Sequence, residues 1–103
     1  MTCFVEVSGP DSLAALVTAL AGDPAAVAGD VASLPAPDGV TVVAQFDEVD
    51  ADTWPYLISV DADSGAEAEV RAIAERLRPT GWAFRAFVDD DQLVAESPSF
   101  ATA

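Results

Sequence analysis

Apolar and polar residues alternate in four segments of the chain, each long enough for a half-buried β-strand. In residues 2–8 the alternation places Cys3, Val5 and Val7 on one face. The same period of two recurs in three further segments, at residues 39–46, 56–60 and 82–88. We therefore expect four strands, each with one apolar face turned toward a core.

Two other segments show the helical period, with apolar residues at every third or fourth position. The first begins after Gly9-Pro10-Asp11 and ends at Gly22, and its apolar stripe consists of Leu13, Leu16, Val17 and Leu20. The second spans residues 65–78, and its stripe consists of Ala66, Val70, Ile73 and Leu77. Pro79 prevents that helix from continuing. Residues 24–34 carry a weaker apolar edge, which predicts a further short helix.

The order strand, helix, strand, strand, helix, strand predicts an α+β fold, the ferredoxin-like βαββαβ plait. It has a four-stranded antiparallel sheet with two helices on one face. A short edge strand is expected after residue 91. Residues 1–96 form a single α+β domain in this prediction, and residues 97–103 form a flexible tail. Because such folds host many unrelated functions, the topology alone assigns none.

Acidic residues are the candidate partner-binding groups. We expect the first and third strands to run parallel and the second and fourth to oppose them. The loop between the second and third strands would then share one pole with the end of the fourth. That predicted acidic pole, with Trp54 as its aromatic anchor, consists of Asp47, Glu48, Asp50, Asp52, Trp54, Asp89, Asp90 and Asp91. Tryptophan is favoured at binding hot spots, so the pole is a candidate docking surface for a cationic partner.

The charge of the whole chain supports that hypothesis. It has 18 acidic residues and four arginines, with no lysine or histidine, for a formal net charge of −14. Such a field repels nucleic acids and anionic membranes, and it attracts a basic protein. Two alternatives stay open: solvated loop acids without a role, and an acidity that records genome composition or adaptation to high salt.

The segment Ser59–Val70, SVDADSGAEAEV, first resembles a calcium loop because Asp61 and Asp63 lie one residue apart. An EF-hand loop that starts at Asp61 needs glycine at its sixth position and glutamate at its twelfth. Alanine occupies both positions, so the calcium interpretation fails. The pattern S-x-x-E predicts a helix start instead, with Ser64 and Glu67 as a capping box. Glu67 and Arg71 are spaced for an ion pair.

The sheet face opposite the helices is a second candidate surface. Its expected apolar members, the predicted dimer face, are Phe4, Val43, Leu57 and Phe87. If the first and fourth strands are antiparallel neighbours, one register opposes both Phe4 to Phe87 and Glu6 to Arg85. A face that is half apolar is too hydrophobic for full solvation, which favours homodimerisation through the sheet.

Catalysis is not expected. The chain has no histidine for proton transfer, no lysine for a Schiff base and no glycine-rich phosphate loop. Its lone cysteine, Cys3, lies in a strand and is expected to be buried. No cofactor or metal is predicted. Because neither a signal peptide nor a membrane span is visible, the expected location is the cytoplasm.

Two functional hypotheses follow. The first is a small, non-catalytic protein–protein interaction module that binds a basic partner, as inhibitors, immunity proteins and antitoxins do. The second is a sheet-mediated dimer that binds a small ligand in a regulatory role.

Overall fold

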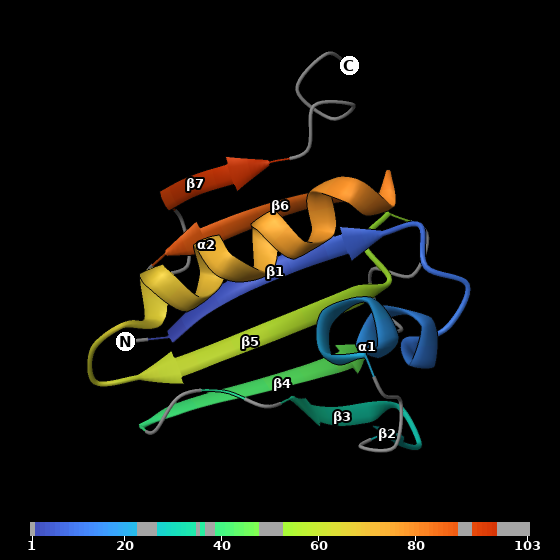
Figure 1. The fold of residues 1–103 in the computed structure, drawn as a ribbon, viewed down its shortest axis with the longest axis horizontal. Helices are drawn as coiled ribbons and strands as arrows, with labels where there is room; N and C mark the ends of the chain where they lie inside the picture. The colour runs from blue at the N-terminus through green and yellow to red at the C-terminus, as the bar shows by residue number, and fades with distance from the viewer. Residues whose placement is uncertain are drawn as a thin grey trace.

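A computed structural model describes residues 2–22, 27–34, 36, 39–47, 53–88 and 92–96 of the chain. In this part the protein is α+β: one antiparallel sheet lies behind two α-helices, which cover the same face (Figure 1). The elements are β1 (Thr2–Ser8), α1 (Leu13–Ala21), β2 (Val27–Ala28), β3 (Val31–Leu34), β4 (Val40–Phe46), β5 (Tyr56–Ala62), α2 (Ala66–Leu77), a 3₁₀ turn (Arg78–Thr80), β6 (Ala83–Val88) and β7 (Gln92–Glu96).

The sheet is wider than the predicted four strands. Its order within the described residues is β2-β3-β4-β5-β1-β6-β7, and the four predicted segments are its centre, β4-β5-β1-β6. The predicted edge strand after residue 91 is confirmed as β7, which pairs with β6. The predicted tail, residues 97–103, lies outside the described residues.

The predicted short helix at residues 24–34 is wrong. Residues 27–34 form a hairpin of β2 and β3, and residues 24–26 lie outside the described part. Gly29 has φ +64°, a conformation that glycine adopts without steric cost and that reverses the chain here. Ala32 is buried between exposed Val31 and Ser33, the alternation of a strand, and β3 is held by its pairing with β4.

The predicted strand directions are also wrong. β1 is antiparallel to both β5 and β6, and β4 is antiparallel to β5, so β1 and β4 run the same way. Register places Val7 opposite Tyr56 at one end of the sheet and Cys3 opposite Val88 at the other. The β4–β5 connection and the end of β6 therefore leave from opposite ends (Figure 1). The rule that each βαβ crossover joins parallel strands fixes this arrangement.

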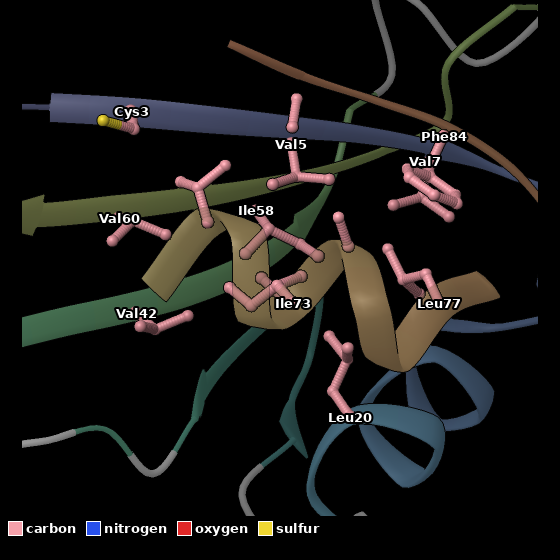
Figure 2. Close-up of a cluster of buried hydrophobic side chains, with 14 of the residues drawn as sticks. Cys3, Val5, Val7, Leu20, Val42, Ile58, Val60, Ile73, Leu77 and Phe84 are labelled. Atoms are coloured by element: carbon pink, nitrogen blue, oxygen red, sulfur yellow. The ribbon is translucent and has the colours of Figure 1, made fainter. Parts of the chain in front are cut away.

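The core lies between the helices and the covered face of the sheet. Side chains of α2 point toward the strands: Leu77 lies near Val7 and Phe84, and Ile73 lies beside Ile58 (Figure 2). These five residues are at most 1% exposed. Truncation of a buried side chain of this size to alanine generally costs about 2–5 kcal/mol.

The two helices begin in different ways. Ser12 caps α1, because its Oγ accepts a hydrogen bond from the Ala15 N–H at 3.1 Å, and Gly22 ends α1 as predicted. The predicted capping box of Ser64 and Glu67 is wrong. The N-cap of α2 is Gly65, with φ +85° and no side-chain cap, which leaves Ser64 one residue too early to bond the first turn. Glu67 instead pairs with Arg71 at 3.1 Å, as predicted.

Within the described residues, neither helix has the length and apolar character needed to cross a membrane.

Candidate functional site

The structure describes two of the eight residues of the predicted acidic pole. Among its eight residues, Asp47 and Trp54 are described, and Glu48, Asp50, Asp52, Asp89, Asp90 and Asp91 lie outside the described residues. Asp47 follows β4, and its N–H donates to the Pro55 carbonyl at 2.7 Å, which closes the β4–β5 connection. Val88 ends β6 at the opposite end of the sheet. The reason for a single pole, parallel first and third strands, is therefore absent.

Trp54 lies against an arginine. The Arg85 guanidinium is 4.6 Å from the centroid of the Trp54 ring and 5.3 Å from that of Phe87. Its Nε also donates to Glu6 Oε1 at 3.1 Å. Cation–π contacts of this kind contribute about 0.5–1 kcal/mol when partly exposed. Trp54 thus borders the open face of the sheet, at the end where β4 meets β5.

The open face carries two rows of side chains across the strands. The predicted register is confirmed: Phe4 opposes Phe87, and Glu6 opposes Arg85. One row consists of Val31, Gln45, Leu57, Glu6, Arg85 and Glu96, and the other of Ser33, Val43, Ser59, Phe4, Phe87 and Leu93. Val31 and Leu93, at 45% and 46% exposure, are the two exposed large hydrophobic residues in the described part. The four predicted dimer-face residues are all partly exposed and lie here.

A cavity of about 390 Å³ lies at one end of the covered face, open to solvent. It is formed where α1 begins, β2 turns into β3, β4 ends and β5 starts, and its lining is Ser12, Leu13, Ala14, Gly29, Asp30, Phe46 and Tyr56. The Phe46 N–H donates to the Asp30 carbonyl at 2.9 Å and so fixes the β2–β3 turn against β4. The Phe46 and Tyr56 rings meet edge to face, with centroids 5.8 Å apart.

Tyr56 is the most unusual polar residue of this cavity. The residue is 6% exposed. Because no buried side-chain polar atom of the described residues lacks a hydrogen-bond partner, its hydroxyl, which bonds to no described residue, reaches solvent. Burial raises the pKa of the phenol above its ordinary value, and the nearby Asp11 carboxylate raises it further. The buried ring is thus part of the core, and the hydroxyl lies at its solvent-accessible edge.

A second cavity, of about 220 Å³, separates α1 from α2 above β3 and β4. Its interior is apolar, with Leu20, Val42 and Ile73, and Glu69 and Arg76 lie at its edge. Both cavities lie on the helix side of the sheet.

The other candidate chemistry is sparse. Cys3, the lone cysteine of the chain, has no exposed surface, as predicted. Across the described residues, no group of three or more histidine, cysteine, aspartate or glutamate side chains is arranged to hold a metal ion. Two further arginines pair with carboxylates of α2: Arg71 with Glu67, and Arg78, in the turn that follows, with Glu75 at 2.9 Å.

The sequence interpretation missed the cavity because it placed Asp30 in a helix and Phe46 in a strand, with no reason for the two to be neighbours. Asp30 was placed inside a helix, and only the hairpin brings it beside Phe46. The available signal was the position of Phe46 and Tyr56 at facing ends of two alternating segments on the apolar face. Comparison with protein-family models, curated proteins and solved structures finds no match to this chain.

Proposed function

We propose that the chain is a small, non-catalytic protein–protein interaction module that binds a basic partner, in the manner of an inhibitor, immunity protein or antitoxin. The observation that carries the proposal is a carboxylate excess that the protein's own arginines do not relieve. The formal net charge is −14, and three of the four arginines are paired with carboxylates of the same chain. We further infer that the central strands and both helices constitute a ferredoxin-like plait, widened by three edge strands.

Electrostatics gives this proposal a definite kinetic and salt signature. A surface potential of one sign steers an oppositely charged partner, so association is fast at low salt and slows as salt screens the charges. Exposed ion pairs add little affinity individually, about 0–1 kcal/mol each. A buried anchor beside the acids is therefore also needed for tight binding.

The test is capture of binding proteins from the source organism on the immobilised chain, followed by reconstitution with each purified candidate. An unrelated protein of equal size and net charge serves as the matched control. We expect a basic protein that binds the chain more tightly than the control, with a Kd that rises steadily with NaCl. Retention of the same proteins by both matrices, or a Kd that is independent of salt, contradicts the proposal.

The open face supports a second candidate, a homodimer formed through the sheet that binds a small ligand in a regulatory role. Phe4, Leu57 and Phe87 lie at its centre, and Arg85 is neutralised there by Glu6. From strand spacing and rise, six strands present roughly 500 Å² in projection, and side-chain relief raises the accessible area toward the ~800 Å² per partner of a standard interface.

Salt distinguishes the two candidates because it should change the affinity of the homodimer and the affinity for a basic partner in opposite directions. Two copies with a charge of −14 repel each other, so a homodimer tightens as NaCl rises, whereas a complex with a basic partner weakens. Sedimentation of the wild type at low and high salt measures the first. Phe4→Glu together with Phe87→Glu should give a monomer, and Thr41→Glu, at the polar margin of the sheet, is the control. A wild type that is monomeric at all salt concentrations removes this candidate.

A further inference from the structure

The cavity of about 220 Å³ between the two helices, which we name the inter-helix cavity, has an apolar interior built by several elements. Leu20 comes from α1, Val42 from β4 and Ile73 from α2 (Figure 2). Leu34 of β3 is the cross-strand partner of Val42 and also lines the cavity. Apolar side chains therefore surround this space, and it suits an apolar group of a ligand, which leaves water on binding.

The edge of the cavity carries one acid and one base on the same helix. Glu69, Ile73 and Arg76 stand at positions i, i+4 and i+7 of α2, which lie on one face of a helix. The two charged residues are therefore two turns apart, about 10.5 Å along the helix axis, with Ile73 between them. A ligand that contacts both needs a cation and an anion of its own.

Glu69 and Arg76 are also the two charged residues of this segment whose side chains are free to meet a ligand. The segment, α2 with the turn after it, has six charged residues, and four of them form ion pairs: Glu67 with Arg71, and Glu75 with Arg78. The side chains of Glu69 and Arg76 form no ion pair or hydrogen bond with any described residue. The helix dipole favours an acid in the first turn and a base in the last, but it does not select the face that lines the cavity.

The charges select the class of ligand. The net charge of −14 opposes the approach of a simple anion, and Arg76 opposes a simple cation at this edge. A zwitterion has no net charge, so the field of the protein does not repel it. Its two charged groups match Glu69 and Arg76, and an apolar group attached to it matches the interior.

We propose that the inter-helix cavity binds a free α-amino acid with an aliphatic side chain. Its ammonium group donates to the Glu69 carboxylate, its carboxylate accepts from the Arg76 guanidinium, and its side chain enters beside Ile73. A leucine side chain has four carbon atoms and needs roughly 120 Å³ at the volume share of a water molecule, so the cavity of about 220 Å³ accommodates it. This inference does not rest on the proposed function, because the cavity lies on the helix side of the sheet and its ligand is not a basic protein.

The isoleucines make the test simple, because the chain has two and Ile73 lines the cavity whereas Ile58 does not. NMR of protein labelled with ¹³C at the isoleucine δ1 methyl groups is recorded during titration with L-leucine. We expect saturable shifts that are larger at Ile73 than at Ile58. Glycine keeps both charged groups but lacks the side chain, so it should not saturate. L-leucinamide lacks the anion and N-acetyl-L-leucine lacks the cation, so each should bind several-fold more weakly than leucine.

Two variants assign the charged groups. Arg76→Gln should weaken leucine binding about two- to fivefold, the range for an exposed ion pair, and should bind leucine and leucinamide equally. Glu69→Gln should show a loss of the same size and should bind leucine and N-acetylleucine equally. The matched control is Glu67→Gln with Arg71→Gln, which removes one acid and one base of α2 that do not line the cavity. This control should bind leucine as the wild type does.

The preference between leucine and its analogues separates binding from a structural role of the two residues. A residue that only stabilises the helix through its dipole would change stability and leave that preference as it is in the wild type. Linear shifts with leucine, or equal affinity for leucine and glycine, overturn the amino-acid site. An unchanged preference in Arg76→Gln and Glu69→Gln, or an equal loss of affinity in the Glu67→Gln with Arg71→Gln control, also overturns it.

Discussion

Tyr56 connects the core of the protein to its cavity, and burial together with one neighbouring carboxylate shifts its pKa. Its ring is packed against Phe46, and burial together with the Asp11 charge raises the pKa of the phenol above about 10. The raised value means that the folded state favours the neutral phenol. That contribution to stability is complete below about pH 10 and is lost as the pH rises through the folded pKa.

Asp11→Asn should lower the pKa of Tyr56 toward its ordinary value, because the repulsive charge is removed and only the desolvation remains. Absorbance at 295 nm during alkaline titration reports the single tyrosinate. Asp63→Asn, an exposed aspartate beyond the opposite end of β5, is the control and should leave the titration unchanged. An unchanged midpoint in Asp11→Asn would show that the Asp11 charge does not reach the phenol.

Gly9 is a residue whose replacement should be costly for two reasons. Its φ is +129°, and a Cβ built there lies 2.6 Å from Cδ1 of the Trp82 indole ring. Gly9→Ala therefore combines backbone strain with a clash, and we expect a loss of about 2–4 kcal/mol in the free energy of unfolding. Gly39→Ala is the matched control, since φ is also positive there but no atom lies within 4 Å. Urea denaturation of both variants should place Gly9→Ala well below Gly39→Ala; equal losses would mean that the indole contact is unimportant.

At the scale of elements, the sequence predicted what depends on the period of apolar residues and missed what depends on pairing. Both helices and the four central strands follow from periodicity, and the pairs Phe4–Phe87 and Glu6–Arg85 follow from one register. Residues 27–34 were misassigned because an alanine-rich segment gives a weak period, and the hairpin depends on neighbours in β4.

The cavity could not be predicted from local sequence patterns either. Its acids are single residues in separate segments, and Asp30 reaches Phe46 only through a backbone hydrogen bond between β4 and the β2–β3 turn. No local pattern encodes such a contact. The argument for a single acidic pole was wrong for a related reason, because it joined two acidic segments through strand direction, which is a property of the whole sheet.

The two helix starts allow a direct comparison of caps. Ser12→Ala removes the side-chain acceptor for the Ala15 N–H and should cost about 1 kcal/mol of stability. Ser64→Ala should cost only a few tenths of a kcal/mol, because α2 is capped at Gly65 without a side-chain bond. Urea midpoints of the two variants measure the difference. A loss in Ser64→Ala as large as that in Ser12→Ala would restore the capping box.

At the scale of the whole molecule, the charge of −14 should make stability depend on salt even without a partner. Unpaired carboxylates repel one another in the compact state, and salt screens that repulsion, with a Debye length falling from about 30 Å at 0.01 M to about 8 Å at 0.15 M. We therefore expect the urea midpoint to rise with NaCl while the m-value stays constant. Urea is the denaturant of choice because guanidinium is itself a salt, and sulfate is avoided because it strengthens apolar burial without regard to charge.

The same titration separates charge repulsion from other effects of salt. The variant Asp89→Asn, Asp90→Asn, Asp91→Asn carries three fewer negative charges than the wild type, so its midpoint should start higher and rise less with NaCl. Sucrose, which stabilises compact states without screening, should raise both midpoints equally. If NaCl raises the two midpoints in parallel, salt does not act by relieving charge repulsion. A basic partner that neutralises these carboxylates would then not stabilise the fold by relieving repulsion.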